Sequence, residues 1–292
     1  MSPAVLEVAI EPVSRTDQDK LVALLKELAA RETPFGFAMD GETRQIVIRG
    51  ESERQLELVI DRLRRRFGIA INVGAPQVAY RETLGRRSEV DHTYKKQSGG
   101  SGQFARIKLV FEPGAPGSGY SFENKVVGGS IPKEFIPGVE RGLASSRETG
   151  VLEGFPVIDF KVTLVDGNYH DVDSSVLAFE IAALVAFRDG LAKAQCKLLE
   201  PIMKVEVTTP MECGADCIDD LVQRRGRVLG VAANGDMQIV SVLVPFASLL
   251  GYATSLRMMS HGRAVHRAAF DQYASIPGSN DGPFRPAVGM RA

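Results

Sequence analysis

The stretch Val157-Ile158-Asp159-Phe160-Lys161-Val162-Thr163-Leu164-Val165 alternates apolar and polar side chains and leads to the turn Tyr169-His170-Asp171-Val172-Asp173-Ser174-Ser175. Alternation with a period of two predicts a β-strand that buries one face. The apolar run after the turn has helical spacing, and Asp173 or Ser174 can cap its start. Its expected apolar face comprises Val176, Leu177, Phe179, Ile181, Ala183, Leu184 and Phe187. Such a helix must lie along a sheet, so a polar turn is predicted at the end of an α/β unit.

A second polar loop lies earlier in the chain. It reads Lys95-Lys96-Gln97-Ser98-Gly99-Gly100-Ser101-Gly102-Gln103-Phe104 and follows a long polar strand. A strand at Tyr120 to Val126 and a helix from about Pro137 to Ser146 separate the two loops. We therefore expect a central domain at residues 77–199 that carries both of them.

The segment before this domain has the order strand, helix, strand, strand, helix, strand over residues 1–76. Thr16 is the expected cap of its first helix, because Asp19 follows three residues later. Asp40-Gly41 is a turn signal between the two middle strands. This order predicts a ferredoxin-like βαββαβ sandwich.

The segment after the central domain repeats that order over residues 200–275. It contains a helix ended by Gly226, a hairpin around Asn234-Gly235 and one helix from about Ala247 to Ser260. A second ferredoxin-like sandwich is predicted, which makes the fold class α+β. The turn-rich residues 276–292 are predicted to form a disordered tail.

Composition limits the classes of function. The chain has 292 residues, of which 44% are hydrophobic and 24% charged, and its formal net charge is −1. A net charge near zero argues against indiscriminate coating of nucleic acid, which needs a strong positive field. No apolar stretch reaches the ~20 residues of a membrane span, and no signal region follows Met1. We expect a cytoplasmic, monomeric protein.

The three cysteines, Cys196, Cys213 and Cys217, do not form a metal-binding pattern. Cys213 and Cys217 are four residues apart, but no second Cys pair or nearby His completes a zinc site. All three are expected to be reduced thiols.

Five runs of sequence, in this order, closely resemble the elongation factor G family. They are Gly74 to Thr83, Lys95 to Gly100, Gly128-Gly129-Ser130-Ile131-Pro132, Tyr169 to Ser175, and Leu199 to Val207. The match covers nearly the whole chain and corresponds to the third, fourth and fifth domains of that family.

The resemblance implies a ribosomal translocase that moves tRNA and mRNA. The fourth domain of the family enters the decoding region of the small subunit, and the fifth contacts large-subunit RNA near the factor-binding centre. Carried over by position, the expected tip residues are Tyr169, His170, Asp171, Asp173, Lys95, Lys96, Gln97, Ser98, Gly99, Gly100, Gly102 and Gln103. Arg224, Arg225 and Arg227, at the end of a predicted helix, are the expected RNA-binding residues of the last domain.

The chemistry of the two loops agrees with RNA as the partner. An RNA helix presents 2′-hydroxyls on a wide, shallow minor groove, which suits a narrow protrusion with short polar side chains. Gly99, Gly100 and Gly102 let backbone amides approach phosphates, and Lys95 and Lys96 supply positive charge. A flexible hairpin loop remains the structural alternative for the glycines.

Three other interpretations are open at this stage. A metal site at His170, Asp171 and Asp173 would need further ligands from the fold. A hydrolase is disfavoured, because neighbours in one turn do not easily form a nucleophile, base and orienting group, and Ser174 is better used as a helix cap. A small-molecule-sensing module fits the two flanking sandwiches but leaves the central domain unexplained.

The chain also departs from the family. The phosphate loop GxxxxGK[ST] is missing, so no GTP or Mg²⁺ site is expected here, and the family's GTPase domain would be a partner in cis. Where the family has Gly-Glu-Leu-His-Leu, this chain reads Ser52-Glu53-Arg54-Gln55-Leu56. This difference suggests a divergent paralogue, serving elongation, ribosome recycling or another duty. No catalysis is expected in this chain.

Overall fold

A computed structural model describes residues 6–14, 17–31, 35–39, 46–74, 77–97 and 102–277. The chain divides into two compact units. Tyr80–Leu199 forms the central unit, and the other unit contains both Met1–Ala79 and Glu200–Ala274. The three-domain division of the chain stays a prediction.

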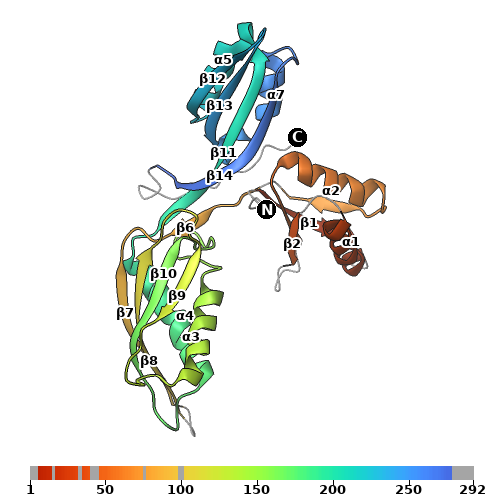
Figure 1. The fold of residues 1–292 in the computed structure, drawn as a ribbon. Helices are drawn as coiled ribbons and strands as arrows, with labels where there is room; N and C mark the ends of the chain where they lie inside the picture. The colour runs from red at the N-terminus through yellow and green to blue at the C-terminus, as the bar shows by residue number, and fades with distance from the viewer. Residues whose placement is uncertain are drawn as a thin grey trace. The chain divides into compact units, whose positions relative to one another are not determined.

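The N-terminal part has the predicted order of elements (Figure 1). They are β1 (Leu6–Pro12), α1 (Gln18–Arg31), β2 (Gly36–Met39), β3 (Ile46–Gly50), α2 (Glu53–Arg65) and β4 (Ile71–Val73). The sheet order is β2-β3-β1-β4 with antiparallel neighbours, and the short strand β5 (Gln77–Val78) also pairs with β1. This topology confirms the ferredoxin-like sandwich. Thr16 and Asp40-Gly41 lie outside the described residues.

The second helix of this part begins with a reciprocal cap. The hydroxyl of Ser52 accepts the N–H of Gln55 at 3.3 Å, and the side-chain oxygen of Gln55 accepts the N–H of Glu51 at 2.7 Å. Two N–H groups that have no partner inside the helix are thereby satisfied. Gln55 therefore has a local structural role at the start of α2.

The central unit is a four-stranded sheet with two long helices on one face (Figure 1). Its elements are β6 (Arg81–Thr83), β7 (Ser88–Lys96), β8 (Gln103–Pro113), β9 (Tyr120–Asn124), η2 (Lys133–Phe135), α3 (Ile136–Ser146), β10 (Phe160–Asn168) and α4 (Val176–Lys193). The order is β7-β8-β10-β9, and β9 runs parallel to β10 while the other pairs are antiparallel. The expected strand, turn and helix around Tyr169 to Ser175 are confirmed.

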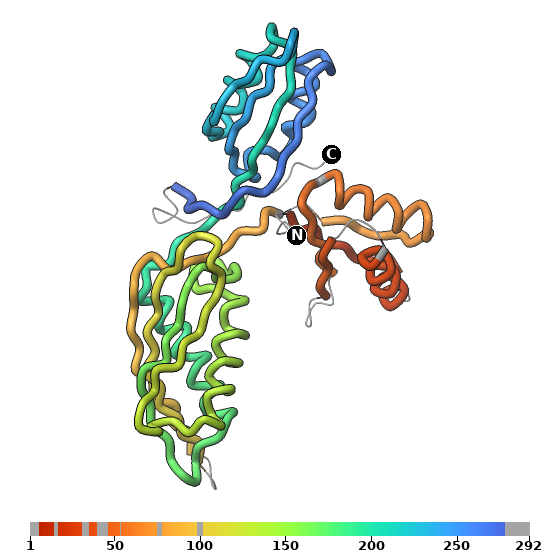
Figure 2. Tube along the Cα trace, in the orientation of Figure 1, coloured from red at the N-terminus to blue at the C-terminus, as the bar shows by residue number. Residues whose placement is uncertain are grey.

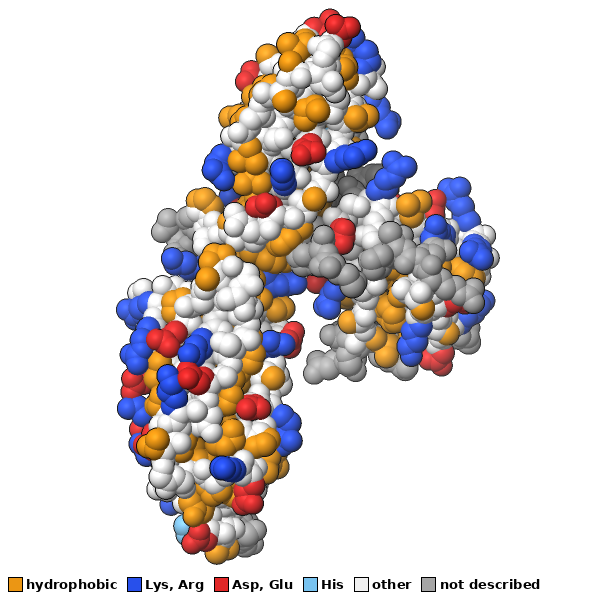
Figure 3. Space-filling view, in the orientation of Figure 1, with side chains coloured by type: hydrophobic (Ala, Val, Ile, Leu, Met, Phe, Trp, Pro, Cys, Tyr) orange, Lys and Arg blue, Asp and Glu red, His pale blue; other side chains and the backbone are white. Residues whose placement is uncertain are grey.

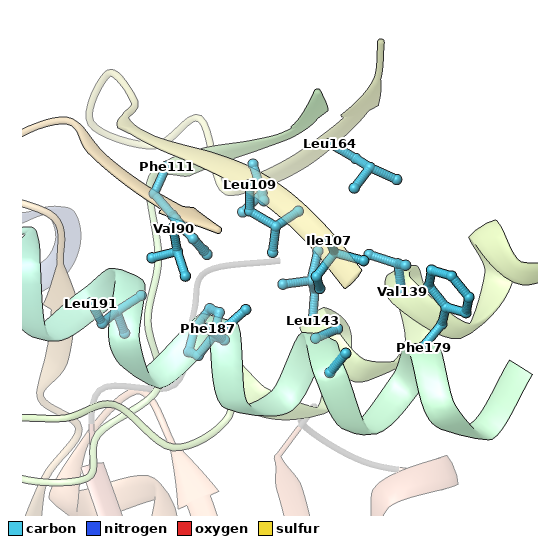
Figure 4. Close-up of a cluster of buried hydrophobic side chains, with 14 of the residues drawn as sticks. Val90, Ile107, Leu109, Phe111, Val139, Leu143, Leu164, Phe179, Phe187 and Leu191 are labelled. Carbon is cyan, nitrogen blue, oxygen red and sulfur yellow. The ribbon is translucent and has the colours of Figure 1, made fainter. Parts of the chain in front are cut away.

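The core of this unit lies between the sheet and the helices (Figure 4). Ile107 and Phe111 of β8 face Phe187 of α4. The rings of Phe111 and Phe187 pack edge to face, and their centroids lie 6.1 Å apart. The predicted apolar face of α4 is too broad, because Leu177 is 54% exposed. Alanines take that place: Ala178, Ala182, Ala183 and Ala186 are fully buried and let α4 approach the sheet and α3 closely.

A buried carboxylate organises the loop 150–155 of the central unit. Glu82 is fully buried, and its two oxygens accept five consecutive backbone N–H groups at 2.9 to 3.2 Å. The donors are Val151, Leu152, Glu153, Gly154 and Phe155. Gly150 packs so closely against this carboxylate that a side chain there would collide with it. Five donors compensate the burial of the charge.

The C-terminal part repeats the topology of the N-terminal part. Its elements are β11 (Lys197–Pro210), η3 (Met211–Cys213), α5 (Gly214–Gln223), β12 (Arg227–Asn234), β13 (Met237–Pro245), α6 (Phe246–Leu249), α7 (Tyr252–Met259) and β14 (Val265–Ser275). The sheet order β12-β13-β11-β14 confirms the second ferredoxin-like sandwich. The first residues of β11, Lys197 to Leu199, also pair with β6.

Two predicted helix ends in this part are wrong. The expected single helix near Ala247 to Ser260 is two helices, because Gly251 adopts a positive φ of 74° between them. The left-handed residue that follows α5 is Arg225, at φ 66°, and not Gly226 as predicted. Gly226 is required for packing instead, since a side chain there would meet the carbonyl oxygen of Leu221, to which Gly226 donates at 2.8 Å.

The end of the chain is only partly described. Ile276 donates to the carbonyl of Leu198 at 3.1 Å, and residues 278–292, most of the predicted tail, lie outside the described part. No helix in the part of the chain that the structure describes is long and apolar enough to cross a membrane.

Candidate nucleic-acid interface

The turn between β10 and α4 is held by its own side chains. The amide oxygen of Asn168 accepts the N–H of Tyr169 at 2.9 Å, and His170 Nδ1 accepts the N–H groups of Val172 and Asp173 at 3.3 Å each. The hydroxyl of Ser174 accepts the N–H of His170 at 2.9 Å. Side chains of this kind commonly stabilise turns by bonding nearby backbone. The turn is therefore a defined structure.

The same turn is bonded to the glycine-containing loop. Asp173 Oδ1 accepts the N–H of Gly102 at 2.9 Å, and the backbone oxygen of Asp173 accepts the N–H of Phe104 at 2.8 Å. The hydroxyl of Ser174 donates to the carbonyl of Phe104 at 2.7 Å. Figure 2 shows the two segments at one end of the central unit. We call residues 95–97, 102–104 and 169–174 the tip.

The helix cap was predicted at the wrong residue. Ser175 caps α4, since its hydroxyl accepts the N–H of Ala178 at 3.1 Å. Asp173 and Ser174 are not free to cap the helix, because both bond the other loop of the tip. These bonds hold the described parts of the two predicted loops side by side.

The side chains of the tip are largely exposed. His170 has 58% of its side chain accessible, and Lys95, Lys96, Gln97 and Asp171 are also exposed. Gln103 accepts a hydrogen bond from the hydroxyl of Tyr94 at 2.8 Å. The ring of Tyr169 lies beside that of Phe135, and the two ring centroids are 6.3 Å apart. Ser98, Gly99 and Gly100 lie outside the described residues.

Val172 is a tip residue that sequence reasoning missed. It is 75% exposed and lies between Asp171 and Asp173. An exposed valine next to polar side chains offers an apolar contact for a base or a sugar. Its position inside the run Tyr169 to Ser175 was the available signal.

The described residues of the tip provide hydrogen-bond donors, and none of their side chains forms a pair of a nucleophile and a base. Because Nδ1 of His170 accepts two backbone N–H groups, the neutral ring carries its proton on Nε2. The hydroxyl of Ser174 bonds the backbone of His170 and Phe104, not the imidazole ring. The geometry therefore provides hydrogen-bond donors and lysine charges at an exposed surface, and it disfavours the hydrolase interpretation.

The described residues include no group of three or more His, Cys, Asp or Glu that is arranged to hold a metal ion. The three cysteines are free and buried. Burial raises the pKa of the Cys196 thiol to about 12, so this thiol is protonated at neutral pH.

The arginines of the C-terminal part have different environments. Arg224 bonds Asp220 at 2.7 Å and the carbonyl of Ser248 at 2.8 Å, and it lies over the ring of Tyr252. This guanidinium ties α5 to the two helices that follow β13.

Arg225 is also engaged within the protein. It forms two hydrogen bonds with Glu200, at 3.2 and 2.5 Å, and the Glu200 side chain is only 3% exposed. Arg227, at the start of β12, is exposed, and no hydrogen bond or ion pair of its side chain is found among the described residues. The role of all three in RNA binding stays a prediction, and Arg227 is the most accessible candidate.

Comparison with protein families gives three matches along this chain. Residues 1–75 match "Elongation Factor G, domain III", residues 76–195 match "Elongation factor G, domain IV", and residues 197–281 match "Elongation factor G C-terminus".

Individual relatives give the same result. The chain is 53% identical over 273 residues to elongation factor G of Cereibacter sphaeroides and of Paracoccus denitrificans, which covers 94% of the chain but 39% of each relative. A crystal structure of a protein from Thermus thermophilus superposes with a TM-score of 0.75 at 37% identity, over 95% of this chain and 41% of that one. The chain thus spans about two fifths of the length of these relatives.

Proposed function

The chain belongs to the elongation factor G family, and from this premise we propose that it is the ribosome-binding arm of a translocase. Its central unit would insert the tip into the decoding region of the small subunit and promote movement of tRNA and mRNA. One observation carries the proposal: two loops 70 residues apart are bonded into a single exposed tip by Asp173 and Ser174.

The chemistry of the tip supports an RNA partner. The Nε2–H of His170, the amide of Gln97 and the ammonium groups of Lys95 and Lys96 are donors suited to phosphates and 2′-hydroxyls. Because the turn is held by its own hydrogen bonds, little conformational freedom would be lost when it binds.

The C-terminal sandwich would contact large-subunit RNA near the factor-binding centre. Arg227 is the residue best placed for a phosphate contact, because Arg224 and Arg225 hold neighbouring elements together. GTP and Mg²⁺ would bind a GTPase domain acting in cis, and we propose that the residues of this chain neither bind nor hydrolyse GTP. The protein would act as a monomer in the cytoplasm.

A recycling or otherwise specialised paralogue is the second candidate. It is favoured by Gln55, which stands where the family usually has histidine and whose side chain bonds the backbone of Glu51. A change at this position bears on coupling between the first sandwich and a nucleotide switch. A sensing module for small molecules would use the sandwiches but leave the tip without a role.

Co-sedimentation of the 292-residue chain with ribosomes tests the proposal. We expect binding that weakens as salt rises, and Lys95→Gln with Lys96→Gln should lower the salt dependence by roughly one unit of slope per lost phosphate contact. The matched control is Lys193→Gln with Lys197→Gln, which makes the same charge change at the end of α4 and the start of β11. Failure to co-sediment, or equal effects of the two variants, would refute the tip assignment.

A further inference from the structure

The outer face of the central sheet, opposite α3 and α4, carries a lattice of paired charges. Alternate residues of its four strands point to this face, and cations and carboxylates are interspersed over it (Figure 3). We call this set the charge ladder, and it consists of Arg87, Glu89, Asp91, Arg106, Lys108, Glu112, Glu123, Lys125, Lys161 and Asp166. Its five cations and five carboxylates cancel.

Glu89 of β7 is the centre of one half of the ladder. Its carboxylate lies 2.6 Å from the ammonium of Lys108 and 3.4 Å from Arg87. Arg87 also reaches Glu112 at 3.9 Å. Lys108 lowers the pKa of Glu89, chiefly through their hydrogen bond, and Glu89 raises the pKa of Lys108 for the same reason.

The rest of the ladder has two more centres. Arg106 binds Asp91 with two bonds, at 2.9 and 2.5 Å, and reaches Asp166 at 3.5 Å. Glu123 of β9 lies 2.6 Å from Lys161 and 3.2 Å from Lys125, and these two lysines, Lys161 first, lower its pKa. Every cation of the ladder thus has a carboxylate partner within 4 Å.

The ladder stops where the tip begins. Asp91, Thr93 and Lys95 are successive outward residues of β7, but Lys95 has no ion-pair partner within residues 77–97 and 102–277. Lys96 also lacks one among those residues, but by the alternation of β7 it lies on the opposite face. The outer face therefore changes from paired charges to one unpaired cation, Lys95, along a single strand.

Stability alone is a weak explanation for the ladder, because exposed ion pairs contribute little to folding. Their effect on nucleic acid is larger. A cation binds a phosphate productively when it releases counterions, and a cation already paired with a carboxylate must first give up that partner. Without its carboxylates, the outer face would hold five unpaired cations over a flat sheet.

We propose that the carboxylates of the charge ladder are specificity determinants that keep RNA off the sheet and confine RNA contacts of this domain to the tip. The second half of this statement rests on the proposed function, whereas exclusion of RNA from the sheet does not. The partner class excluded is any RNA presented through its phosphate backbone.

The test uses the full chain and a generic RNA duplex labelled for fluorescence anisotropy, without ribosomes. The ladder variant is Glu89→Gln with Glu123→Gln, which releases Lys108, Lys161 and Lys125. We expect its affinity for the duplex at about 50 mM salt to rise on the order of tenfold, with a salt slope steeper by roughly two units.

The matched control is Glu140→Gln with Glu153→Gln, two exposed carboxylates for which no cation partner occurs in the described part of the chain. It changes the net charge equally but releases no cation, so its affinity should stay close to that of the parent. Equal gains in both variants would show a simple net-charge effect and overturn the proposal. No gain in the folded ladder variant would also overturn it.

A compensated variant guards against misfolding. Adding Lys108→Gln and Lys161→Gln to the ladder variant removes two of the three released cations and restores the parental net charge, so duplex affinity should fall toward the parent value. Tight binding that persists in this variant would point to an unfolded chain or another surface and would overturn the proposal. Ribosome co-sedimentation of the parent, measured separately, decides the proposed function whatever these variants do.

Discussion

Two loops of the central unit use one side chain to gather several backbone N–H groups, and they differ in burial. Glu82 is fully buried and accepts five N–H groups from the loop 150–155, whereas His170 is mostly exposed and accepts two from its own turn. A buried acceptor, Glu82, anchors a loop to the core, whereas an exposed acceptor, His170, fixes the shape of a turn whose side chains remain accessible to solvent. Burial, more than residue type, separates the structural polar group Glu82 from His170, for which an RNA-binding role is proposed.

The largest expected effect is that of Glu82→Gln. The substitution removes the charge and places an amide N–H₂ against donors, so about 3 to 5 kcal/mol of stability should be lost. Urea unfolding of the full chain measures this loss. Glu153→Gln, in the same loop but exposed, is the control and should stay within about 0.5 kcal/mol. Similar midpoints for the two variants would contradict the anchoring role.

The comparison extends to the arginines of the C-terminal part. Arg225→Gln leaves the buried Glu200 carboxylate without its partner and should cost about 1 to 3 kcal/mol, while Arg227→Gln should cost less than about 0.5 kcal/mol. Thermal melts of both variants measure this difference. A simultaneous replacement of Arg224, Arg225 and Arg227 would mix unfolding with loss of RNA contacts, so Arg227→Gln alone is the informative variant for ribosome binding. Equal melting shifts would remove the distinction between them.

Sequence patterns predicted what depends on local periodicity. The strand before Tyr169, the helix after Ser175 and both ferredoxin-like topologies follow from apolar spacing and turn residues, and all are present. Long-range partners are not encoded in such patterns. Asp173 and Ser174 are suitable helix-capping residues by type. Only the fold shows that their side chains bond the backbone of Gly102 and Phe104 instead.

The same limit explains the missed anchors. Glu82 lies in the run Gly74 to Thr83, and an isolated glutamate in a strand gives no sign of the distant loop that it binds. The sequence predicts Arg225 as a helix-end cation, but its left-handed backbone and its pairing with Glu200 of β11 depend on a fold that brings the turn between α5 and β12 to that strand.

A smaller effect is expected at the junction of the two tip loops. Asp173→Ala removes the acceptor for Gly102 and should cost about 1 kcal/mol, since the carboxylate is partly exposed. Hydrogen exchange at the Gly102 amide should accelerate. Asp171→Ala, an exposed neighbour, serves as the control and should leave that exchange rate unchanged. Unchanged exchange in the Asp173 variant would mean that the carboxylate does not hold the loop.

The central claim is that the tip acts at the decoding region, and His170→Ala tests it most directly. The variant would be placed in a full-length factor of the family whose domains III to V carry this sequence. Because His170 is exposed and, among the described residues, its side chain bonds its own turn, stability should change by less than about 1 kcal/mol.

The deciding measurement is the rate of single-turnover translocation beside the rate of ribosome-stimulated GTP hydrolysis, together with a thermal melt of the same protein. The account predicts slower translocation, nearly unchanged GTP hydrolysis and a nearly unchanged melting temperature. Translocation at the parental rate, with or without a shift in melting temperature, would contradict the assignment of the tip.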